Sequence, residues 1–176
     1  KMFIVPFVTI LIVVPLTFLV VGPVANTASD WIGIAFKAVY SFSPIVYGLV
    51  LGASWQVLVM FGLHWGLVPL AIVDLTQNGS SVILTAAVLP CFTQTGVLAA
   101  IWLKTREAKV KQGVIPALIS SIFGVTEPSI YGYTLPMRTP FIVSCIVSGI
   151  VGIYLSIFNV TCYAMGGMGL VLYPAY

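Results

Sequence analysis

The sequence carries very little charge for its length. Only 6% of its 176 residues are charged, whereas 60% are hydrophobic, and the mean hydropathy is +1.15. An ordinary soluble domain has about a quarter of its residues charged. The shortage of charge therefore excludes a soluble globular protein, and the net charge of +3 is too small to indicate binding to nucleic acid.

Residue patterns that bind metals or nucleotides are also scarce. The three cysteines, Cys91, Cys145 and Cys162, lie in apolar runs with no CxxC pair, and the chain has a single histidine. Neither a disulfide framework nor a metal site is supported, and we interpret the cysteines as small packing residues. The Gly-Gly-Met-Gly sequence at 166–169 has no basic partner of the P-loop type, so no nucleotide site is indicated. We therefore expect no cofactor.

Long apolar runs make up most of the chain. Each spanning helix needs about 20 apolar residues, and polar or Gly/Pro-containing turns divide the runs into pieces of that size. The sequence predicts an all-α membrane protein with multi-spanning helices and re-entrant hairpin segments. We expect exit turns at 22–30 and 74–80 and a loose terminal piece from 166 onward. The predicted spans are about 2–22, 33–51, 54–73, 81–103 and 139–161.

The basic residues set the orientation of these spans. Lys104, Arg106, Lys109 and Lys111 lie in one loop and are four of the seven basic residues, so the positive-inside rule places this loop in the cytoplasm. Counting back through four spans places the turns at 22–30 and 74–80 outside. Three tryptophans near predicted span ends are interpreted as interfacial anchors: Trp31, Trp55 and Trp102.

One carboxylate, Glu127, lies in an apolar segment that prolines interrupt. An unpaired carboxylate in a bilayer is costly, so its presence indicates a substrate, ion or proton site. Pro128 disfavours the α conformation at Glu127, which predicts a helix break there. Two limbs too short to span meet at this break and predict a re-entrant hairpin at about 113–137, with Glu127 near its tip. The structural alternative is a carboxylate paired with Arg138, Lys111 or a helix end.

The only histidine, His64, is the second candidate for chemistry. A lone histidine on an apolar face is more often structural than functional. Here Trp65 adds an aromatic plane, and a neutral imidazole both donates and accepts hydrogen bonds, as a sugar hydroxyl requires. If His64 and Glu127 converge, they would hold a polyol with Trp65 or Tyr131 against its apolar face. The same two residues would also suit a proton relay.

Two motifs make the chain similar to a known family. FGLHWGLVP at 61–69 and FGVTEPSIYGYTLP at 123–136, followed by Met-Arg-Thr-Pro-Phe, resemble the membrane-spanning IIC component of sugar phosphotransferase systems of the glucose superfamily. The His-Trp-Gly-Leu-Val-Pro form resembles the β-glucoside-specific branch more than the sucrose or trehalose branches. The resemblance covers about residues 55–160 well. It implies that residues 1–176 are a partial IIC-type transport domain in the bacterial cytoplasmic membrane.

The resemblance also implies an activity and partners. A IIC protein binds an extracellular sugar, here of the β-glucoside type, and carries it inward by an elevator-like motion. A IIB phosphocysteine then donates phosphate to the sugar, so the chain would be one part of a sugar phosphotransferase. The donor would belong to another domain or chain, because the three cysteines here lie in apolar runs. The expected partners are the sugar, the IIB domain, membrane lipid and a second copy, joined through helices missing from this chain.

The resemblance assigns roles to individual residues. Glu127 would contact sugar hydroxyls and would orient or deprotonate the acceptor hydroxyl. His64 would approach the same sugar, and their neighbours Thr126 and Trp65 complete the predicted substrate-binding set. Two alternatives remain: a proton-coupled secondary transporter or channel in which Glu127 and His64 relay protons, and a purely structural membrane subunit.

Overall fold

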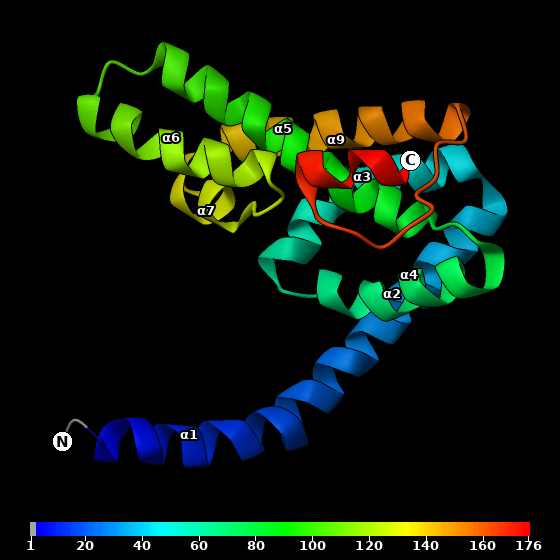
Figure 1. Ribbon diagram of the computed structural model, residues 1–176, viewed down its shortest axis with the longest axis horizontal. Helices are drawn as coiled ribbons and strands as arrows, with labels where there is room; N and C mark the ends of the chain where they lie inside the picture. The colour runs from blue at the N-terminus through cyan, green and yellow to red at the C-terminus, as the bar shows by residue number, and fades with distance from the viewer. Residues whose placement is uncertain (1–2) are drawn as a thin grey trace.

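The structure is a computed structural model and describes residues 3–176. Helices account for most of this range (Figure 1), and within it the only β-type pairing is an isolated bridge, so the predicted all-α class is confirmed. The elements are α1 Ile4–Leu16, η1 Thr17–Val21, α2 Gly22–Phe42, α3 Pro44–Met60, α4 His64–Asn78, α5 Val82–Lys104, α6 Ala108–Ile122, α7 Glu127–Ser129, η2 Ile130–Thr134, α8 Leu135–Met137, α9 Thr139–Ile157 and η3 Gly169–Ala175.

Among residues 3–176, three helical segments are long and apolar enough to cross a membrane. They are Ile4–Phe42, Val82–Lys104 and Thr139–Ile157. The last two lie close to the segments 81–103 and 139–161 taken from the sequence. A multi-spanning membrane protein is thereby supported by the structure as well as by composition.

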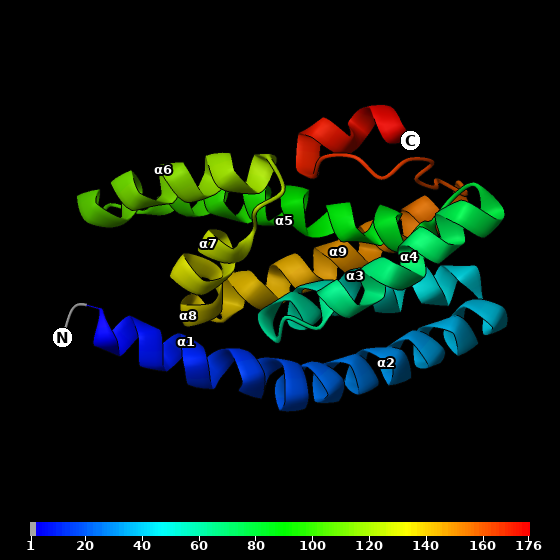
Figure 2. The ribbon, with the colours of Figure 1, turned by 60° about the horizontal axis from the view of Figure 1, so that its bottom comes forward.

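The first segment is a continuous helical rod made of α1, η1 and α2. Its α2 part packs against α3 and α4, whereas α1 projects away from the other helices (Figure 1 and Figure 2), and none of the residues of α1 is buried. The predicted exit turn at 22–30 is therefore wrong, because these residues are helical. Pro23 lies in the first turn of α2, directly after the wider π-helical turn η1, where a missing N–H costs little.

The next helix boundary also differs from the sequence prediction. A break was expected near residues 52–53, but α3 runs from Pro44 to Met60 and the chain turns at 61–63. The chain does break just before Pro44, where α2 ends at Phe42 and Ser43 is extended. Pro44 then starts α3, and the Ser43 hydroxyl accepts a hydrogen bond from the Val46 N–H at 3.4 Å.

Helix α3 packs closely against α9, and the two run antiparallel. Gly48 and Gly52 on α3 face Gly152 and Ser148 on α9, and a Cβ added to Gly52 would lie 2.5 Å from the Ser148 carbonyl oxygen. Small residues at every fourth position let membrane helices approach to backbone contact. The glycines that suggested a turn in the sequence therefore form the central helix contact of the bundle.

A buried polar network joins α3, α5 and α9. The Gln56 amide nitrogen donates to Ser148 Oγ at 3.0 Å and to Thr93 Oγ1 at 3.2 Å. Its amide oxygen accepts from Ser144 Oγ at 2.6 Å and from Gln94 Nε2 at 2.5 Å. Buried polar groups need partners, so this network favours a single register among α3, α5 and α9.

Helices α6 and α7 to α8 form the two limbs of a hairpin. α6 ends at Ile122 and the next helical segment begins at Glu127, so the predicted helix break at Glu127 is confirmed. The limbs are joined inside by the Ser129 hydroxyl, which donates to the Ala117 carbonyl at 3.1 Å and is also hydrogen-bonded to the Ser121 hydroxyl. That this hairpin is re-entrant in a membrane stays a prediction.

Candidate functional site

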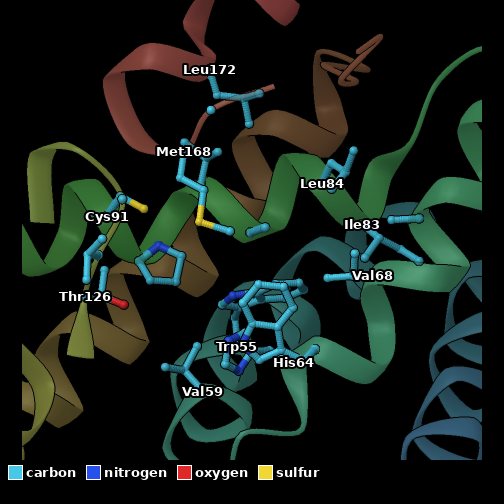
Figure 3. Close-up of a pocket in the computed structure, with 18 of the residues that line it drawn as sticks. Trp55, Val59, His64, Val68, Ile83, Leu84, Cys91, Thr126, Met168 and Leu172 are labelled. Atoms are coloured by element: carbon cyan, nitrogen blue, oxygen red, sulfur yellow. The ribbon is translucent and has the colours of Figure 1, made fainter. Parts of the chain in front are cut away.

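A cavity of about 290 Å³ lies where α3, α4, α5, the hairpin turn and the C-terminal segment meet (Figure 3). All four residues of the predicted substrate-binding set line it: His64, Trp65, Thr126 and Glu127. Its volume is near the lower end of the range of small-molecule pockets, about 300–1,000 Å³. The structure thus brings together two motifs that are far apart in the sequence.

His64 is the first residue of α4 and follows the turn at 61–63. Its side chain is half-buried, and its Nδ1 atom is buried without a hydrogen-bond partner among residues 3–176. A buried polar atom left unpaired costs about 1–3 kcal/mol. The ring of Trp65, whose side chain is 61% exposed, lies 5.7 Å from the imidazole between centroids. The exposed ring of Trp65, beside the imidazole, is available to a bound molecule.

Thr126 and Glu127 reach the cavity from the hairpin turn. Thr126 is buried at 5% exposure, whereas the Glu127 side chain is exposed. Within residues 3–176, the Glu127 carboxylate forms no ion pair with Arg138 or Lys111, and the Lys111 ammonium instead lies 5.0 Å from the ring centroid of Trp102. The structural alternative of a pairing with Arg138 or Lys111 is therefore not seen, whereas its third form, a carboxylate at a helix end, matches the position of Glu127 in the first turn of α7.

Two aromatic residues differ from their sequence interpretation. Trp55 is only 5% exposed and lines the cavity, so its interpretation as an interfacial anchor is wrong. The reason is that α3 begins at Pro44, which places Trp55 well inside the helix. Tyr131 does not line the cavity, and its hydroxyl donates to the Met60 carbonyl at 2.8 Å. The aromatic surface at the site comes from Trp55 and Trp65.

The C-terminal segment forms a wall of the cavity that the sequence did not predict. Residues 165–168 and Leu172 line it, and Met168 extends toward it from above in Figure 3. This segment lies directly on the hairpin turn, because a Cβ added to Gly124 would be 2.8 Å from the Gly169 backbone nitrogen. These residues are apolar or glycine, so no charge or motif marked them as part of a site.

The site combines apolar walls with a few polar groups. Most of its lining is apolar, and the polar side-chain atoms belong to Trp55, His64, Trp65, Cys91, Thr126 and Glu127. Such a cavity suits an uncharged molecule that has hydroxyl groups and an apolar face. Among residues 3–176, no three His, Cys, Asp or Glu side chains gather in a way that could hold a metal ion.

Replacing Gly124 by alanine should detach the C-terminal wall from the hairpin. Gly124 has a φ of +96°, which L-residues adopt at a cost of about 1–2 kcal/mol, and its added Cβ would collide with backbone of residues 168 and 169. We expect a lower thermal midpoint and weaker ligand binding. Gly132→Ala is the matched control, because Gly132 has nothing within 4 Å of an added Cβ. Equal behaviour of the two variants would contradict this contact.

The fold and the cavity together define an all-α, multi-spanning membrane protein with a small-molecule site inside its helix bundle. A family model described as "Phosphotransferase system, EIIC" matches residues 1–149. The chain belongs to this family, which is an integral component of the inner membrane.

Individual relatives agree with the family match. The chain is 49% identical over 176 residues to the "PTS system beta-glucoside-specific EIIBCA component" of Halalkalibacterium halodurans, covering 100% of this chain and 28% of that protein. It is 38% identical to a protein of the same description from Dickeya chrysanthemi, covering 93% and 26%. A "PTS system MurNAc-GlcNAc-specific EIIBC component" of Staphylococcus aureus is 33% identical, with 96% and 35% covered. No solved structure matches the chain.

The chain therefore spans 28% and 26% of the length of the two β-glucoside-specific relatives. Both relatives are described as EIIBCA components, and the matched region is one part of each of these longer proteins.

Proposed function

We propose that this chain forms the sugar-binding part of a phosphotransferase-system IIC protein that moves a β-glucoside-type sugar inward. The observation that carries the proposal is the meeting of His64, Trp65, Thr126 and Glu127 in one cavity, from two motifs in different parts of the chain. The β-glucoside class follows from the descriptions of two relatives. The proton-coupled transporter is not favoured, because the family match explains the same residues.

The side chains divide the binding of a sugar between them. The Glu127 carboxylate accepts hydrogen bonds from sugar hydroxyls, and the imidazole of His64, which lines the same cavity, supplies a further partner. The rings of Trp55 and Trp65 offer flat apolar surface to the C–H face of the sugar. Together these groups fix the orientation of the acceptor hydroxyl, which is the main requirement of phosphoryl transfer.

The transfer itself needs a donor from outside the chain. The acceptor hydroxyl oxygen of the sugar attacks the phosphorus of the IIB phosphocysteine, the sulfur–phosphorus bond breaks, and the cysteine leaves as a thiolate. The hydroxyl proton goes to the Glu127 carboxylate or to water. Glu127 is the exposed first residue of α7, so a partner domain can approach the sugar that it holds. Lipid and a second copy of the protein, joined through helices outside this chain, complete the proposed setting.

Uptake by the full-length protein tests the energy source of transport. In vesicles supplied with phosphorylated IIB domain, an aryl β-glucoside should accumulate as its phosphate. Most of this uptake should persist when an uncoupler dissipates the proton gradient. Removing the phosphoryl donor should abolish accumulation. Uptake that is lost with the uncoupler while the donor is intact would instead establish the proton-coupled alternative through Glu127 and His64.

A further inference from the structure

A second cavity, of about 440 Å³, lies between α2, α3, α4 and the start of α5. It is separate from the site of His64 and Glu127 and has a more polar lining. One basic and one acidic side chain line it, Lys37 on α2 and Asp74 on α4. Its other polar side chains are Tyr40, Ser41, Tyr47, Asn78, Ser80 and Thr161.

The two charged groups of this cavity do not neutralise each other by direct contact. Within residues 3–176, Lys37 and Asp74 form no ion pair, although the positive charge of Lys37 acts on the carboxylate. Partial burial raises the pKa of the Asp74 carboxyl, and Lys37 opposes this effect. Both groups therefore keep free hydrogen-bonding capacity. Because their charges balance, the cavity selects neither an anion nor a cation.

Three aromatic rings form one wall of the same cavity. Phe36 and Tyr40 are one helical turn apart on α2, so they share a face. Both pack edge-to-face on Tyr47 of α3, at 6.2 Å and 5.1 Å between ring centroids. The Tyr40 and Tyr47 hydroxyls have no hydrogen-bond partner in the part of the chain that the structure describes. Flat apolar surface edged by hydroxyl groups suits an amphipathic ring with several hydroxyls.

The two cavities are neighbours across a thin wall. Ile83 lines both of them, and α4 contributes Leu67 to the second cavity and Val68 and Ala71 to the first. The turn after Asp74 is predicted to be extracellular, so the second cavity lies on the outer side of the first. A molecule that enters from outside meets the second cavity before it reaches His64.

We propose that the second cavity is an outer saccharide subsite, where an uncharged glycoside binds before it passes Ile83 to the His64 and Glu127 site. The proposal rests on the proposed function, because it takes the same class of ligand. Asp74 accepts hydrogen bonds from sugar hydroxyls, Lys37 and Asn78 donate or share them, and the three aromatic rings face the apolar side of the ring. The outer subsite raises the local concentration of sugar at the inner one.

Equilibrium dialysis of the full-length protein against a radiolabelled aryl β-glucoside tests this subsite. The wild type should bind two molecules per chain. In Asp74→Asn the affinity of the outer subsite should fall by about tenfold or more, so that only one molecule remains bound. Asp30→Asn is the matched control, because Asp30 lies on the exposed side of α2 and lines neither cavity. Lys37→Gln should reproduce the loss if Asp74→Asn fails to fold.

The outcomes separate this proposal from the proposed function. Glu127→Gln should remove only the molecule bound at the inner site. If both molecules remained bound in this variant, the inner site would be overturned while the outer subsite would still be supported. A single bound molecule in the wild type, unchanged by Asp74→Asn and Lys37→Gln, would overturn the outer subsite alone. Phospholipid that co-purifies with the wild type and is lost in Asp74→Asn, without a change in sugar stoichiometry, would show a lipid cavity and also overturn it.

Discussion

Replacing Glu127 by glutamine is expected to weaken binding of a β-glucoside by about 10- to 100-fold. A hydrogen bond to a charged group contributes about 1.5–3 kcal/mol, and glutamine keeps the size of the side chain while removing its charge and one acceptor. Titration calorimetry of the full-length protein with an aryl β-glucoside measures the change. Unchanged affinity would mean that no sugar site exists at Glu127 and would favour a structural subunit.

Glu107→Gln is the control for this variant. Glu107 is exposed in the loop before α6 and does not line the cavity, so its substitution should leave binding unchanged. Phosphorylation kinetics then separate the two roles proposed for Glu127. A general base contributes about 10²- to 10⁴-fold to kcat, so a loss of that size would identify proton transfer. A raised KM with an unchanged kcat would show that Glu127 only binds the sugar and neither orients the acceptor hydroxyl nor takes its proton.

Replacing Gly52 by leucine is expected to prevent the close packing of α3 and α9. The first added carbon would already lie 2.5 Å from the Ser148 carbonyl oxygen, and backbone cannot move aside as a flexible side chain can. Overpacking of this kind costs about 1–3 kcal/mol, occasionally more. Because Gln56 lies one turn further along α3, the displaced helix would also lose hydrogen bonds of the buried network. Thermal unfolding of the purified protein should show a clearly lower midpoint, with reduced yield.

The control for the packing variant is Gly96→Leu. Gly96 is also within a helix, α5, but an added Cβ there has nothing within 4 Å. Both substitutions replace a helical glycine by the same residue, so the helix-propensity term is shared. If the two variants had equal thermal midpoints, the α3 to α9 contact would not be the central packing interaction of the bundle.

The candidate site could be found from the sequence because its polar residues are conspicuous. A carboxylate before a proline and a lone histidine beside a tryptophan are rare in so apolar a chain, and the structure places both on one cavity. Met168 and its glycine neighbours could not be found, because apolar residues in an irregular segment carry no period and no charge. Their position depends on the contact between Gly124 and Gly169, which only the folded chain contains.

The errors in the fold have a common physical origin. Glycine and proline were interpreted as turn residues at 22–30 and near 52–53, whereas Pro23 lies within a continuous helical rod and Gly52 is a packing contact. Local propensity does not distinguish these uses of the same residue. Trp55 was misplaced for the same reason, since its depth follows from where α3 begins.

The wall formed by residues 165–168 allows the shape of the cavity to change independently of its polar groups. It has no charged side chain, and it lies on a different segment from His64 and Glu127. A change at Met168 would alter the shape of the cavity without replacing the Glu127 carboxylate. Under the proposed function, single substitutions in this segment would change which group attached to the sugar fits the cavity. Substitutions in the two motifs would instead remove the side chains proposed to bind the sugar.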